Sequence, residues 1–135
     1  MKTLFVDTSA FIALIDKDDQ YHRTAKEFYQ KLKPPFKLTT TNFVVCETIN
    51  FLRARLPLKY AVEFREDIFS SNIISTIHVT PKIEDSAFSI MKAQKDKTYS
   101  FTDCTSFAVM KDLGISTSFT FDEHFKQIGF TVVPL

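Results

Sequence analysis

Short apolar segments alternate along the chain with longer segments in which apolar residues recur at helical spacing. A short apolar or β-branched segment is typical of a strand, and recurrence every three or four residues is typical of an amphipathic helix. On these criteria strands are predicted at 3–6, 37–40, 71–79, 116–121 and 131–133. Helices are predicted at 9–15, 22–33, 41–56, 57–69, 81–91, 103–113 and 122–128.

Prolines and glycines fall where these elements begin and end. The proline pair at 34–35 ends the second helix, Pro57 and Pro81 each open a helix, and Gly114 stops the sixth. Because strands and helices alternate, we expect a three-layer α/β/α fold with a parallel sheet covered on both faces. Ligands of such sheets bind beyond the carboxyl ends of the strands.

Length and composition indicate a single domain spanning 1–135. The chain is 44% hydrophobic, has a net charge of +1, and shows neither an internal repeat nor a linker. The near-neutral charge excludes a basic nucleic-acid arm but allows a local binding patch. With only two glycines, Gly114 and Gly129, the chain has no glycine-rich phosphate-binding loop.

The two cysteines, Cys46 and Cys104, lack the spacing of a zinc site. We expect both thiols to be buried in small apolar sites and the protein to be cytoplasmic, because isolated thiols suit a reducing compartment. No stretch is long enough to cross a membrane. Asp7 interrupts the N-terminal apolar run, which argues against a signal peptide.

Glu47 interrupts the almost wholly apolar segment 41–52. No cationic residue lies three or four positions away, and Val44 three positions earlier cannot form a capping box with it. A carboxylate on an apolar helix face is costly unless its charge is compensated. Two explanations stay open: a buried salt bridge to a distant Arg or Lys, or a bound cation.

Three aspartates lie where the predicted strands and helices meet. Asp7 directly follows the strand at 3–6, Asp122 follows the strand at 116–121, and Asp103 opens the helix at 103–113. Taken singly, each could serve only as a helix cap. Taken with Glu47, they place an acid from four different elements at the carboxyl edge of the sheet.

Such a group of carboxylates needs a cation or raised pKa values. Two carboxylates about 4 Å apart repel by on the order of 4 kcal/mol at an effective dielectric constant of about 20. Mg²⁺ and Mn²⁺ prefer oxygen ligands, activate water and neutralise phosphate charge. The site has no obvious histidine base: His124 is either a surface residue or a substrate contact. Metal-dependent phosphoester chemistry is therefore the predicted reaction.

At these acids the chain resembles the PIN-domain family, especially its VapC-type toxins. The resemblance covers essentially the whole chain, with the four acids in register. The matching segments are VDTSAFIAL with Asp7, VVCETINFL with Glu47, SFTDCTSFAVM with Asp103 and TSFTFDEHF with Asp122.

The resemblance implies a five-stranded parallel sheet with flanking helices and a Mg²⁺- or Mn²⁺-dependent endoribonuclease site that leaves a 5′-phosphate. It implies that Asp7 and Asp103 bind the metal most directly and that Glu47 and Asp122 act through waters or a second ion. It also implies a homodimer and an antitoxin partner. The family's hydroxyl positions beside the acids are matched by Thr8, Ser9 and Thr120. A further acid of some relatives is replaced here by Ser106, so the number of metal ions stays open.

Other functions remain alternatives at this point. A catalytically silent RNA- or protein-binding domain could use the same scaffold, and a cleavage assay with and without EDTA would distinguish it. A phosphoryl-accepting domain would need paired acids after the first strand, and a dehalogenase-like phosphatase would need an acid where Ser9 stands. The basic residues also have alternative roles. Arg53 and Arg55 either border the site or contact a partner protein. Lys92, Lys95 and Lys97 either contact RNA phosphates or form a solvated helix end.

Overall fold

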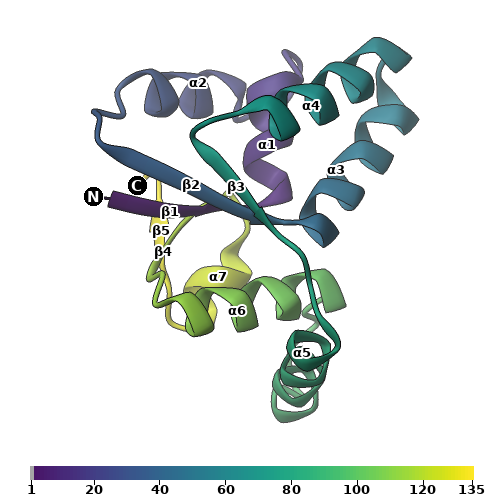
Figure 1. Cartoon of the computed structure of the whole chain (residues 1–135), viewed down its shortest axis with the longest axis vertical. Helices are drawn as coiled ribbons and strands as arrows, with labels where there is room; N and C mark the ends of the chain where they lie inside the picture. Colours follow the sequence, from purple (N-terminus) through teal and green to yellow (C-terminus); the bar gives the residue numbers. More distant parts are fainter. Residues whose placement is uncertain (1) are drawn as a thin grey trace.

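Five parallel strands form one sheet in the order β3-β2-β1-β4-β5 (Figure 1). The computed structural model describes residues 2–135. The strands are β1 (Lys2–Val6), β2 (Phe36–Thr41), β3 (Ile74–Ile77), β4 (Thr117–Phe119) and β5 (Thr131–Val133). This confirms the predicted number of strands and their parallel direction.

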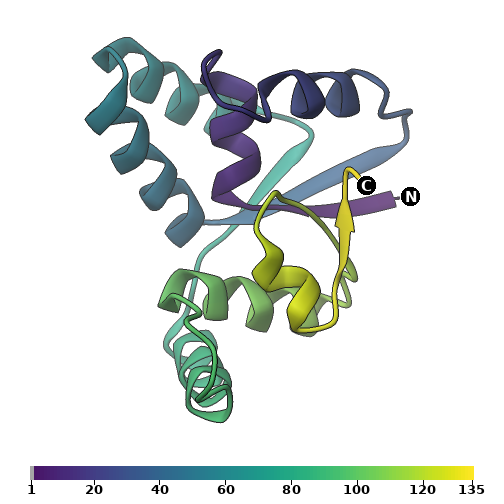
Figure 2. The same ribbon diagram turned by 180° about the vertical axis from the view of Figure 1, so that it is seen from behind.

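Helices cover both faces of the sheet, which confirms the three-layer arrangement. Helices α1 to α4 lie together on one side, and α5 to α7 lie on the other (Figures 1 and 2). They are α1 (Thr8–Ile15), α2 (His22–Gln30), α3 (Asn42–Arg55), α4 (Leu58–Ser70), α5 (Pro81–Ala93), α6 (Phe101–Leu113) and α7 (Glu123–Gln127).

The core is built around β1 and α6. Leu4, Phe5 and Val6 of β1 are almost fully buried, as expected for a central strand that is covered on both faces. On α6, Phe107 is fully buried and its ring meets that of Phe125 on α7, with centroids 5.0 Å apart. The core therefore fixes β1 and α6, the two elements that carry Asp7 and Asp103 at or near their ends.

Local polar contacts set the ends of the helices. Thr80 accepts a hydrogen bond from Ile83 N and caps α5, which begins at Pro81 as predicted. Gly114 adopts the left-handed conformation (φ 66°) that stops α6. Helix α6 begins at Phe101, two residues before the predicted start, because Ser100 forms a capping box with Asp103.

Two strands are shorter than predicted. The β3 segment begins only at Ile74, because Ser71 Oγ accepts hydrogen bonds from Ile73 N and Ile74 N and holds a turn. The β4 segment ends at Phe119, because Phe121 N donates to Ser9 Oγ at 2.9 Å instead of to a strand. The residues that follow β4 instead contact Asp7 and Ser9 at the sheet edge.

The two cysteines differ in burial. Cys104 is buried as predicted, but Cys46 is exposed, so the prediction for Cys46 was wrong. Phe69 of α4 is 50% exposed. Within residues 2–135, no helix combines the length and the apolar character needed to cross a membrane.

Candidate functional site

The four predicted acids line one pocket at the carboxyl edge of the sheet. The pocket has a volume of about 630 Å³. It lies where β1 and β4 end and where α1, α6 and α7 begin, and α3 forms one wall. Asp7, Glu47, Asp103 and Asp122 thus come from four elements that are far apart in the sequence.

Asp7 is a helix cap and a pocket residue at once. It accepts from Ser9 N at the start of α1, which is the cap geometry expected from the sequence. Its Oδ2 also accepts hydrogen bonds from Ser9 Oγ at 3.0 Å and Thr120 Oγ1 at 2.9 Å. Burial, and then the charge of Asp103, raises the pKa of Asp7 from 3.8 to about 7.

Asp103 lies in the first turn of α6 and is 7% exposed. Ser100 N donates to its Oδ2 at 3.4 Å, and Ser100 Oγ accepts from Asp103 N at 3.0 Å. Burial is the main reason that the pKa of Asp103 is raised, and the charge of Asp122 adds to it. The hydrogen bond from His124 opposes this rise.

His124 belongs to the acidic cluster, so the expectation of a site without histidine was wrong. Its Nδ1 lies 2.8 Å from Asp103 Oδ2 and 3.4 Å from Asp122 Oδ1. One ligand atom from each of these three residues lies within 4.8 Å of the other two. Asp122 caps α7 and accepts from His124 N, so the cap itself brings the imidazole into the cluster. The two-residue spacing from Asp122 was the sequence signal for this arrangement.

Glu47 lines the pocket but is exposed, which corrects the premise that its charge is buried. The ion pairs among residues 2–135 do not include Glu47, so the salt-bridge explanation was also wrong. The apolar neighbours that suggested burial point away from it: Val44 and Val45 enter the core. Helix α3 therefore presents Glu47 to the pocket from its solvent-facing side.

The three predicted hydroxyl residues, Thr8, Ser9 and Thr120, differ in their contacts with the acids. Ser9 and Thr120 hold Asp7, and their own oxygens lie 3.1 Å apart. Thr8 lines the pocket, and its buried Oγ1 has no hydrogen-bond partner among the described residues. Ser106 is buried and donates to Thr102 O within α6. A serine at that position adds no charge to the acidic cluster.

These residues fit a divalent cation. Carboxylate oxygens dominate the donor set, which suits a hard cation, and the imidazole of His124 adds one nitrogen. Burial is the main cause of the raised pKa values of Asp7 and Asp103, and a neighbouring carboxylate adds to each of them.

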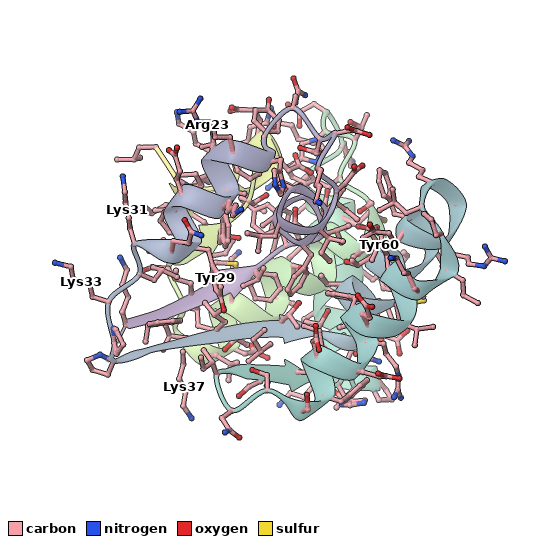
Figure 3. The ribbon with its side chains drawn as sticks, turned by 90° about the horizontal axis from the view of Figure 1, so that it is seen from above. Arg23, Tyr29, Lys31, Lys33, Lys37 and Tyr60 are labelled. Carbon is pink, nitrogen blue, oxygen red and sulfur yellow. The ribbon has the colours of Figure 1, made fainter. Side chains whose placement is uncertain are left out.

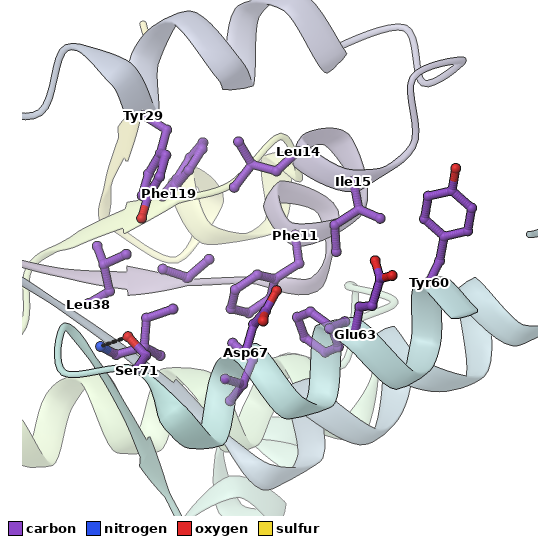
Figure 4. Close-up of a pocket in the computed structure, with 14 residues that line it drawn as sticks. Phe11, Leu14, Ile15, Tyr29, Leu38, Tyr60, Glu63, Asp67, Ser71 and Phe119 are labelled. Carbon is purple, nitrogen blue, oxygen red and sulfur yellow. Dashed lines mark hydrogen bonds between the residues drawn. The ribbon is translucent and has the colours of Figure 1, made fainter. Parts of the chain in front are cut away.

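A second hollow of about 310 Å³ lies between the sheet and helices α1, α2 and α4 (Figure 4). Its wall is mainly apolar, with Phe11, Leu14 and Phe119 pointing inward and Glu63 and Asp67 on α4. None of the four predicted acids lines it. It therefore lacks the chemistry that the sequence predicted.

The basic residues lie mostly outside the acidic pocket. None of Lys92, Lys95 and Lys97 lines it. Arg55 packs over the ring of Phe51 at 4.0 Å, and Phe51 is part of the pocket wall. Lys31, Lys33 and Lys37 project outward around the turn between α2 and β2 (Figure 3).

Comparison with known proteins places these features in a family. The model of the PIN domain matches residues 4–131. The 23S rRNA-specific endonuclease VapC20 of Mycobacterium tuberculosis is 38% identical over 130 residues, which cover 96% of this chain and 97% of the relative.

Solved structures agree with the fold. The crystal structure of Mycobacterium tuberculosis VapC20, described as a sarcin–ricin loop cleaving toxin, has a TM-score of 0.88 and 35% identity. The match covers 95% of this chain and 96% of that one. A toxin–antitoxin complex from Klebsiella pneumoniae has a TM-score of 0.69 at 14% identity, over 97% and 96% of the two chains. The second match shows the fold alone.

Proposed function

The chain belongs to the PIN-domain family, and from this premise we propose that it is a metal-dependent endoribonuclease, the toxin of a toxin–antitoxin pair. The observation that carries the proposal is the pocket in which acids from β1, α3, α6 and the end of β4 come together. The match to residues 4–131 supports a single nuclease domain spanning 1–135.

The proposed substrate is the sarcin–ricin loop of 23S ribosomal RNA. This rests on the names of the relative with 38% identity and of its crystal structure. The alternative of a catalytically silent binding domain is disfavoured, because all four acids are present and line one pocket. Ribosomal RNA as substrate supports a cytoplasmic location.

Each acid has a proposed role. Asp7, Asp103 and Asp122 would hold the cation, Mg²⁺ or Mn²⁺, and Glu47 would add a further negative charge from α3 to the same pocket. When bound, such an ion neutralises phosphate charge and promotes attack by water. Ser9 and Thr120 keep the Asp7 carboxylate oriented, and His124 does the same for Asp103. Without a cation, the Asp7 carboxyl holds a proton up to about neutral pH.

The proposed protein partners are an antitoxin and a second copy of the chain. Three apolar side chains of α4 that are at least 44% exposed support a protein-binding surface, since they recur at helical spacing: Leu58, Val62 and Phe69. Co-purification with the product of the neighbouring reading frame tests the antitoxin. Sedimentation of the purified chain tests the dimer.

Cleavage of a synthetic sarcin–ricin-loop hairpin tests the activity. We expect cutting in Mn²⁺ or Mg²⁺, loss of cutting in EDTA, and recovery when the cation is restored in excess. Binding of the hairpin without cutting under any of these conditions would instead support the silent binding domain.

Glu47→Gln tests the role of the exposed acid. We expect cleavage to fall by about 100-fold, because the variant removes a negative charge that faces the cation. The melting temperature should change little, since Glu47 is exposed and makes no ion pair among the described residues. Glu66→Gln on α4 is the matched control, because Glu66 is exposed and does not line the pocket. Equal cleavage rates in the two variants would remove Glu47 from the site.

A further inference from the structure

Two stacked aromatic rings stand at the rim of the acidic pocket. Tyr21 and Phe121 have ring centroids 4.5 Å apart and planes inclined by only 5°. Both residues line the acidic pocket, and both also line a neighbouring hollow of about 170 Å³ whose wall includes Val132 and Pro134. The stack therefore forms the boundary between two open spaces.

One side of this stack is accessible. Tyr21 is 40% exposed, although Phe121 covers one of its faces. Phe121 is partly buried and rests edge-on against Phe119 of the core, with centroids 6.2 Å apart. The pair thus forms a flat aromatic surface in which Phe121 rests on the core and Tyr21 is exposed to solvent.

Hydrogen bonds anchor the backbone of both residues. Phe121 N donates to Ser9 Oγ, which also donates to Asp7 Oδ2, so one hydroxyl links the ring's backbone to the acidic cluster. Tyr21 N donates to Asp19 Oδ1 at 2.8 Å. The next residue, His22, has its Nδ1 2.7 Å from Ala13 O and anchors the loop to α1. Rigid placement lowers the ordering cost of binding.

Resting on the proposed function, we propose that Tyr21 and Phe121 form a platform on which an unpaired base of the RNA substrate stacks while its phosphate lies in the acidic pocket. Exposed aromatic rings bind single-stranded bases in this way, whereas bases inside a duplex are not accessible to them. Tyr21 is then a substrate-positioning residue that selects unpaired RNA, such as a loop.

Tyr21→Leu is the main test, because leucine keeps an apolar side chain over Phe121 but has no flat ring. We expect the Kd for a sarcin–ricin-loop hairpin, measured in the Asp103→Asn background to prevent cutting, to rise about tenfold. KM should rise by a similar factor, with kcat nearly unchanged. Tyr21→Phe should restore both values.

The matched control is Tyr29→Leu, a tyrosine of similar exposure at the other end of α2 that points into the apolar hollow (Figure 4). Its Kd should stay at the starting value. In addition, 2-aminopurine placed at successive loop positions should be quenched at one position by the protein with Tyr21, and not by Tyr21→Leu. Melting curves of both variants show whether the fold is intact.

The possible outcomes distinguish a failure of the proposed stacking platform from a failure of the proposed nuclease function. If the protein with Tyr21 cuts the hairpin while Tyr21→Leu matches it in Kd, KM and quenching, the platform alone is overturned. If the unaltered chain neither binds nor cuts the hairpin, the proposed function fails and the platform fails with it. If Tyr21→Leu does not fold, the test is the 2-aminopurine quenching by the unaltered chain. If the unaltered chain quenches 2-aminopurine at none of the loop positions, the platform is overturned.

Discussion

Replacing Asp103 by asparagine is expected to reduce RNA cleavage by a factor of about 1,000, the largest loss of activity that we predict. Asparagine keeps the shape of the side chain and can still accept hydrogen bonds from Ser100 N and His124 Nδ1. It removes the negative charge that, in the proposed function, helps Asp7 and Asp122 to hold the cation. Initial rates on the sarcin–ricin-loop hairpin measure the effect.

Asp112→Asn provides the control for Asp103→Asn, because Asp112 is exposed on the same helix and does not line the pocket. It should cut at the rate of the unaltered chain. An Asp103→Asn protein that retains more than about a tenth of the activity would show that this carboxylate does not hold a required cation.

Replacing Asp7 by asparagine is expected to stabilise the protein in EDTA at pH 8 by about 3 kcal/mol. In the folded chain the pKa of Asp7 is raised to about 7, whereas the ordinary value is 3.8. Between these two pH values the folded state binds more protons than the unfolded state, so stability falls as pH rises and levels off above about pH 7. Asparagine cannot ionise and escapes this loss.

Urea unfolding at several pH values measures this effect. In EDTA the difference between Asp7→Asn and the unaltered chain should be near zero at pH 4, grow as the pH rises to about 7, and then level off. Saturating Mn²⁺ should stabilise the unaltered chain and reduce the advantage of the variant, because the cation compensates the Asp7 charge. A difference that does not change with pH would contradict the raised pKa.

The arrangement of the site followed from the sequence because strand ends are easy to recognise. Asp7 directly follows a short apolar strand, and parallel strands bring their carboxyl ends to one edge. Helix caps did not compete with this role: Asp7 and Asp122 cap α1 and α7 and still line the pocket. Capping a helix and lining the acidic pocket, which were treated as alternative roles, are therefore roles of the same side chain.

Side-chain exposure was harder to predict. Glu47 lies in an apolar segment, but α3 turns Val44 and Val45 into the core and leaves Glu47 and Cys46 outside. Periodicity within one helix does not show which face the rest of the fold will cover. Phe69 is also left outside the core, where the guanidinium carbon of Arg65 lies 4.1 Å from the centroid of its ring.

The sequence pattern did not predict the contacts between side chains of distant segments. The pairing of His124 with Asp103 joins residues 21 positions apart, and the stack of Tyr21 on Phe121 joins two loops that share no motif. Their positions depend on where β4 ends, and that end is set by a side-chain hydrogen bond from Phe121 N to Ser9. Such contacts become visible only in three dimensions.

Anomalous diffraction from crystals soaked in Mn²⁺ is the most direct test of a cation-binding acidic pocket. We expect a peak at about 2.2 Å from a carboxylate oxygen of Asp103 or Asp122, on the side that faces Asp7. Saturated crystals that show manganese only elsewhere on the chain, or none, would contradict it.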